Sequence, residues 1–189
     1  MTTVLTQIPG YVAGTWTIDP THSEVGFTVR HLMVSKVRGR FSRFSGEIVT
    51  GEDPLASSVR AEIDLTSIDT NQPDRDAHLR AADFFEVERY PAMTYQSTAL
   101  RYDGDELVID GELTLHGVTR PVPLKLEVNG FQPNTPAGDS RVGFSATGEL
   151  NRSDFGIAFN MPLDGGGVVV GEKVQLSIDV EAILQTPDA

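Results

Sequence analysis

The sequence predicts an all-β domain built from about eight antiparallel strands. Apolar and polar residues alternate in short runs along most of the chain. Gly, Pro, Asn and Asp separate these runs, as is typical of strands joined by tight turns. Strands that are apolar on one face form either a sandwich or a closed barrel, and only closure removes the exposed strand edges.

The strands follow one another in order. Trp16 and Ile18 alternate before a break at Asp19-Pro20, and Val25, Phe27, Val29 and His31 then share one face of the next run. Asp103-Gly104-Asp105 predicts a hairpin turn. Further apolar alternations lie at residues 59–65, 93–99, 107–115, 122–128, 142–150 and 174–180.

One stretch has helical spacing instead. Ala77, Ala81, Phe84 and Phe85 predict a helix over residues 73–89, with Asn71 as its cap. Residues 129–140 are expected to form a loop, and residues 152–167 a second irregular segment that could cover a barrel mouth. The glycines at 165–167 would give that segment freedom to act as a hinge.

The 189 residues are expected to form one domain over residues 13–185, with loose termini at 1–12 and 186–189. Cysteine is absent, which excludes thiol catalysis, thiolate metal sites and disulfides. Neither a signal-peptide pattern nor an apolar run of about 18 residues occurs, so we expect a soluble cytoplasmic protein without a transmembrane segment.

The formal net charge of −12 disfavours nucleic acid as a partner, because such a chain repels phosphate backbones and anionic membrane surfaces. With 39% hydrophobic residues, the chain is too apolar for a disordered acidic protein. The charge is therefore interpreted as a solvated outer surface.

Small residues at inward positions favour an internal cavity over a filled core. They stand beside the large side chains of Phe27, Tyr95 and Phe144, where a solid barrel more often carries Leu, Ile or Phe. The alternative is that they accommodate the taper of a filled barrel. The small inward candidates are Ala61, Ser97, Ala99, Ala146 and Gly148.

Several phrases of the sequence resemble those of the YceI-like, polyisoprenoid-binding family, in the same order and over nearly the whole chain. They are WTIDPTHSEVGFTVRHL (16–32), RGRFSRFSGEI (38–48), SIDTNQPDRDAHLRAADFFEVERYP (67–91), GELTLHGVTRPV (111–122) and NRSDFGI (151–157).

The resemblance implies an eight-stranded antiparallel lipocalin-like barrel with one short helix between strands. Its tunnel would bind a polyisoprenoid or isoprenoid quinone without a cofactor. Many members of the family look exported, and in this the sequence departs from them. The resemblance places Val25, Phe27, Val29, His31, Phe41 and Phe44 in the tunnel lining, and the candidate ligand-binding set also includes Ile63, Met93, Tyr95, Leu113, Phe144 and Phe155.

Other chemistry finds little support in the residues. The four histidines, His22, His31, His78 and His116, form no metal-ligand spacing, so no metal site is predicted. Neither Ser23 nor Ser153 lies in a GxSxG motif, and the glycine run lacks the Lys and Ser or Thr of a phosphate loop.

Two polar clusters allow two interpretations each. Asp76 and His78, with Asp83 nearby, could form an acid–base pair, but residues two apart on a helix point in different directions, which favours anchoring and capping. Arg152 and Asp154 either brace their own turn, which we favour, or place Arg152 at a barrel mouth to meet a pyrophosphate.

The first functional hypothesis is a carrier or storage protein for an isoprenoid lipid. The rival is an enzyme that acts on a quinone or polyprenyl substrate in the same barrel, with His31, Tyr95 or Asp154 as proton donor. A partner-binding barrel with a filled interior is the third. The sequence leaves the oligomeric state open, with a homodimer among the options.

Overall fold

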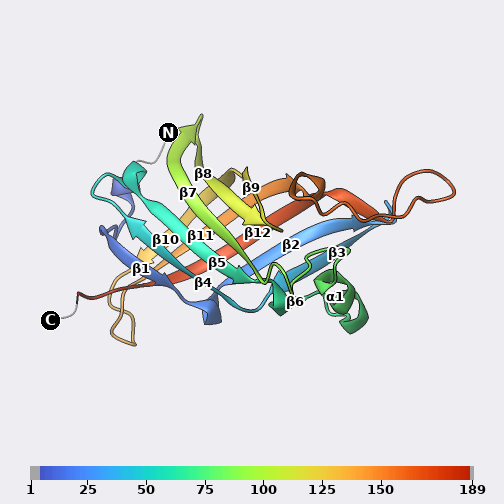
Figure 1. Ribbon diagram of the computed structural model, residues 1–189. Coiled ribbons are helices and arrows are strands. Elements are labelled where there is room, and N and C mark those ends of the chain that lie inside the picture. The colour runs from blue at the N-terminus through green and yellow to red at the C-terminus, as the bar shows by residue number, and fades with distance from the viewer. Residues whose placement is uncertain (1–4, 188–189) are drawn as a thin grey trace.

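The computed structural model describes residues 5–187 and shows a closed antiparallel barrel (Figure 1). Eight long strands run up and down, and each pairs with the next one along the chain. The last strand pairs with the first, which closes the sheet. The predicted eight-stranded barrel is therefore confirmed, and the sandwich alternative is wrong.

The first three long strands are each divided in two. The first consists of β1 (Gly14–Ile18) and β2 (Glu24–His31), the second of β3 (Ser35–Phe41) and β4 (Phe44–Thr50), and the third of β5 (Ser58–Asp64) and β6 (Ile68–Asp69). The other five are β7 (Ala92–Asp103), β8 (Glu106–Leu115), β10 (Leu124–Gln132), β11 (Arg141–Asn151) and β12 (Val170–Leu184). A short strand, β9 (Val118–Pro121), folds back on β8.

Aspartates end several strands by capping short 3-10 helices. The side chains of Asp19, Asp53 and Asp64 each accept a hydrogen bond from the backbone N–H two residues later, at 2.9, 3.0 and 2.9 Å. The helices that follow are η2 (Pro20–His22), η3 (Pro54–Ala56) and η4 (Leu65–Ser67). Local side-chain bonds of this kind give the backbone an alternative to the ladder, and the strand bends there.

β12 stays continuous over 15 residues although its partner strand is broken. The Ser23 hydroxyl accepts from the Glu181 N–H at 2.9 Å and donates to the Glu181 carbonyl at 3.2 Å. The Asp19 N–H also donates to this carbonyl, at 2.8 Å, so Ser23 and Asp19 together bond Glu181 where the break between β1 and β2 interrupts the ladder. β12 can therefore pair with both pieces and close the barrel.

The predicted α-helix is shorter than expected. α1 spans Pro73–Arg80, and Gln72 caps it in place of Asn71, which has a left-handed backbone. After Arg80 the chain continues in turns, and Glu86 is also left-handed. The helical spacing was misleading because Phe84 and Phe85 reach the barrel interior from these turns.

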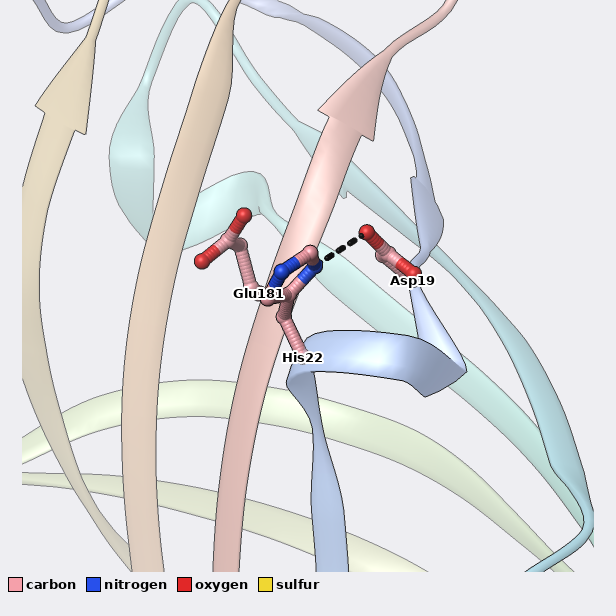
Figure 2. Close-up of side chains that lie close together, drawn as sticks. All are labelled: Asp19, His22 and Glu181. Atoms are coloured by element: carbon pink, nitrogen blue, oxygen red, sulfur yellow. Dashed lines mark hydrogen bonds and ion pairs between the residues drawn. The ribbon is translucent and has the colours of Figure 1, made fainter.

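Arg141 holds the bend between β1 and β2 against the neighbouring strands. Its guanidinium donates to Asp19 at 2.9 Å, to Asp139 at 3.0 Å and to Glu181. His22 Nδ1 contacts the same carboxylate oxygen of Asp19, Oδ2, also at 2.9 Å (Figure 2). The hydrogen bond from His22 is the largest of the contributions that lower the pKa of Asp19 to about 2.

Asp19→Asn is expected to lower the free energy of unfolding at pH 7 by about 1–2 kcal/mol. The unfolded carboxyl has a pKa of about 3.9, so its ionised form stabilises the fold above that pH. The difference between variant and parent should shrink as the pH falls from about 4 towards about 2. Urea unfolding at a series of pH values measures it, and a difference that is constant with pH would contradict the assignment.

Candidate functional site

The barrel encloses an apolar cavity of about 480 Å³. All eight strands contribute inward side chains to it, and both ends of the barrel are included. Eleven of the twelve sequence-predicted candidates line it: Val25, Phe27, Val29, His31, Phe41, Phe44, Ile63, Met93, Tyr95, Leu113 and Phe144. The alternating pattern therefore predicts the inward face well.

Phe155 is the exception among the predicted residues. It lies in η5 (Arg152–Phe155), is only 1% exposed and belongs to the solid core, not to the lining. Its segment has no strand periodicity, so the direction of its side chain could not be predicted from the residue pattern. Ile157 and Phe159, a few residues later, line the cavity instead.

Two glycines keep the cavity open by allowing aromatic rings to lie against the wall. A Cβ atom at Gly39 would lie 2.3 Å from the Phe27 ring, and one at Gly111 would lie 2.3 Å from the Tyr95 hydroxyl. Phe27 and Gly39 are direct cross-strand partners. The absence of side chains at these positions leaves wall space for rings that would otherwise extend further into the lumen.

Three of the five small residues expected to face inward line the cavity, namely Ala61, Ser97 and Ala146. Ala99 does not, because a β-bulge between Ser97 and Ala99 reverses the alternation. Gly148 does not either, since the side chain of Leu124 lies over it.

The amino-terminal segment contributes to the site, although residues 1–12 were expected to be loose. Leu5 and Ile8 line the cavity, and so does Tyr11, whose hydroxyl donates to the Gly51 carbonyl at 2.8 Å. The spacing of Leu5 and Ile8, at i and i+3, was the available signal. Residues 1–4 and 188–189 of the predicted loose ends lie outside the described part.

Tyr95 provides the polar group deepest in the barrel wall. Its hydroxyl donates to the Val122 carbonyl at 2.9 Å. Burial, with a smaller contribution from the charge of Asp110, raises its pKa to about 12. The phenol is therefore neutral and already engaged at physiological pH.

Other polar groups gather at the end of the cavity near α1. The His78 imidazole meets Asp83 at 2.8 Å, and its ring packs on Phe84 and Phe159. Asp76 instead accepts from the Thr70 backbone N–H at 2.9 Å and anchors the helix. The suggested Asp76–His78 pair is therefore not formed, and the anchoring interpretation of Asp76 is confirmed.

Arg152 is buried and organises the segment that covers this end. Its guanidinium donates to the carbonyls of Gly171, Ile157 and Phe159 at 2.9 Å each, and it meets Glu172 at 3.3 Å. Burial lowers the pKa of Arg152. The side chain acts as a brace, as favoured from the sequence, but it does so through carbonyls and Glu172, not through Asp154.

Asp19, His22 and Glu181 have ligand atoms within 4.8 Å of one another and form a candidate metal cluster (Figure 2). The guanidinium of Arg141 already bonds both carboxylates of this cluster. A cation bound there would have to displace an internal cation. The cluster is therefore a structural clasp.

The closed barrel and its apolar interior define a lipocalin-like barrel that encloses a cavity. The model of the YceI-like domain matches residues 16–182, and the chain belongs to this family. Within the chain's described part, no helix is long and apolar enough to cross a membrane.

Known relatives agree with this assignment. The chain is 41% identical to protein YceI of Escherichia coli O157:H7 over 177 residues, which cover 92% of this chain and 89% of that protein. A YceI protein of Campylobacter jejuni has a similar structure, with a TM-score of 0.69 and 28% identity over 83% of this chain and 90% of that one.

Two more distant structures share the fold. Burkholderia cenocepacia BcnA has a TM-score of 0.74 and 20% identity, covering 87% of this chain and 98% of that one. A polyisoprenoid-binding domain from Saccharophagus degradans has a TM-score of 0.66 and 18% identity, covering 92% and 100%.

Gly39→Ala is expected to weaken binding of an uncharged apolar fluorescent probe, such as N-phenyl-1-naphthylamine, by several-fold. The new methyl group would displace the Phe27 ring into the lumen and shorten the available apolar surface. Probe titration measures the effect. Gly143→Ala is the control, since Gly143 lies in β11, does not line the cavity, and a Cβ there would meet only ordinary contacts of 3.4 Å or more. Equal affinities in the parent and both variants would contradict the role of Gly39.

Arg152→Met should lower the free energy of unfolding by about 2–4 kcal/mol, because it removes the donors that satisfy several buried carbonyls. Arg120→Met is the control, since Arg120 is exposed and makes one weak bond of 3.4 Å. Chemical denaturation compares the two. Equal losses would show that burial of the Arg152 guanidinium is not the source.

Proposed function

We propose that this protein binds a long apolar lipid of the isoprenoid type inside its barrel and carries or stores it. The observation that supports this most strongly is the continuous apolar cavity, to which all eight long strands contribute. A cavity of about 480 Å³ lies within the usual range of 300–1,000 Å³ for small-molecule sites.

The lining suits a hydrocarbon chain. Phe27, Phe44, Met93 and Phe144 offer surface with no hydrogen-bonding group to satisfy, and they surround the middle of the barrel from different strands. Burial of apolar area stabilises a bound chain by roughly 25 cal/mol per Å² without directed bonds. Affinity would therefore grow with the length of chain enclosed.

The proposal that the ligand is an isoprenoid is based on similarity to known proteins. The family assignment supports it, and so does the fold shared with the polyisoprenoid-binding domain of Saccharophagus degradans. A polyprenyl chain and an isoprenoid quinone are the two ligand types proposed. Both present methyl-branched hydrocarbon to the same lining.

Binding fits the geometry better than catalysis. Of the three proton donors considered for an enzyme, Tyr95 is committed to the Val122 carbonyl, and Asp154 does not line the cavity. His31 lines it, but within residues 5–187 no hydrogen bond or ion pair orients its imidazole. The three groups therefore do not form a catalytic constellation around one point.

The test is to purify the protein without detergent, extract it with organic solvent and identify the lipid by mass spectrometry. A stoichiometric polyprenyl or quinone species is expected. Phe27→Asp should lose it almost completely, because an unpaired carboxyl would stand in the apolar lumen.

Thr28→Asp is the matched control, since Thr28 neighbours Phe27 on the opposite face of β2. It should keep the lipid. Circular dichroism must show that both variants are folded. A folded Phe27→Asp protein that retains its lipid would place the binding site elsewhere, and an empty parent barrel would contradict lipid carriage itself.

A further inference from the structure

The hairpin that joins β2 to β3 presents large apolar side chains to solvent. Leu32, Met33 and Val34 are 38%, 54% and 80% exposed. Leu32 and Met33 also have positive φ angles of 52° and 62°, in the region that Gly and Asn occupy more easily. Neither solubility nor turn geometry explains these residues, so another requirement must favour them.

A second segment extends the same surface. The Leu32 N–H donates to the Val169 carbonyl at 2.8 Å, and the Val169 N–H donates to the Met161 carbonyl at 3.0 Å. Met161 is 52% exposed. Leu32, Met33, Val34 and Met161 are called the apolar tip below, and the hairpin of β2 and β3 lies at the α1 end of the barrel (Figure 1).

Three cations without acidic partners lie on β2 and β3, next to the apolar tip. Arg30 lies directly opposite Lys36 in the ladder, and Arg38 lies opposite Thr28, on the same outer face. All three cations are exposed, and none makes an ion pair in the described structure. Like charges placed directly across a hairpin destabilise it, so an anionic partner would relieve a real cost.

This local charge contrasts with the rest of the chain. Residues 25–46 contain no acidic residue, whereas the whole protein carries −12. Acids on adjoining segments include Asp164, exposed on the loop, Glu172, which is paired with Arg152, and Asp69, which is paired with Arg40 of β3. Charges more than about 8–10 Å away are largely screened in physiological salt, so a surface in contact with the tip responds mainly to the local cations.

The cavity ends beside the apolar tip. Val29, His31 and Val169 line it, and so does Met161, which belongs to the tip itself. A lipid that left the barrel here could move along apolar side chains. It would not have to cross water.

We propose that the apolar tip inserts into an anionic lipid surface while Arg30, Lys36 and Arg38 contact its headgroups. Exposed apolar side chains flanked by cations are the combination that binds membrane interfaces. The acidic remainder of the barrel is repelled, which orients the mouth towards the lipid. The inference goes beyond lipid binding in the cavity, since docking requires only the outer surface.

Flotation of the purified full chain with vesicles tests the proposal. Binding is expected to vesicles of phosphatidylcholine mixed with phosphatidylglycerol, to be much weaker with phosphatidylcholine alone, and to fall as salt is raised. Val34→Asp should reduce binding about tenfold or more, and Lys36→Gln with Arg38→Gln by a similar factor.

Matched controls separate the tip from general surface effects. Leu55→Asp changes an apolar residue of 41% exposure in η3, and Arg60→Gln removes a cation from β5. Both should bind vesicles like the parent. Equal losses in tip and control variants, or no vesicle binding by the parent, would overturn the proposal.

Two further measurements distinguish membrane docking from dimer formation and from lipid binding in the cavity. If Val34→Asp leaves vesicle binding intact but converts a dimer to a monomer in sedimentation velocity, the tip is a contact between two copies and the proposal fails. Lipid extraction on the same variants separates membrane docking from lipid binding in the cavity. A tip variant can lose vesicle binding while its cavity lipid remains. Conversely, an empty cavity in the parent leaves the flotation result unchanged.

Discussion

Closure of the sheet by β12 is the constraint on which the site depends. An open sheet would expose the inner faces of its edge strands to water and could not enclose an apolar space. β12 must pair with a strand that is bent between Ile18 and Glu24, where the regular ladder is interrupted. There the Ser23 hydroxyl bonds both the N–H and the carbonyl of Glu181, and the Asp19 N–H donates to the same carbonyl. Arg141 ties the bend to β11 and β12. The polar residues of this bend thus keep the barrel closed around its apolar cavity.

The unfilled interior needs support of a different kind. Apolar walls around empty space lose packing contacts, so stability must come from buried clusters at the two ends. Trp16, Val142 and Ala182 form one cluster, and Leu65, Ile68 and Phe155 belong to the other. Between them, the glycines opposite Phe27 and Tyr95 limit how far the rings fill the lumen. The ends therefore carry much of the packing, and the middle is left for a ligand.

The inward faces could be predicted from the sequence because a strand has a period of two and each inward residue identifies the next. Eleven lining residues follow from that rule together with the family resemblance. The rule fails where the period changes: at the bulge that turns Ala99 outward, in the turns after Arg80, and in the irregular segment of Phe155. The hydrogen bonds of Arg152 could not be predicted from the sequence, since their carbonyl acceptors lie up to 19 residues away. Every residue has a backbone carbonyl, so residue identity does not show which ones accept.

The two ends of the barrel differ in how they meet solvent. At the end beside Tyr11, the rings of Tyr11 and Phe131 pack against each other at an angle of 59°, and the Tyr11 hydroxyl donates to the Gly51 carbonyl, so a fixed contact covers the interior. At the α1 end, the cover is the segment braced by Arg152, and its continuation reaches the turn of the β2–β3 hairpin through one backbone bond, from the Leu32 N–H to the Val169 carbonyl. One such bond holds this cover less firmly than a strand ladder would. A lipid would thus leave most easily beside Met161 and Leu32, where the surface is already apolar and the net charge of the chain is locally reversed.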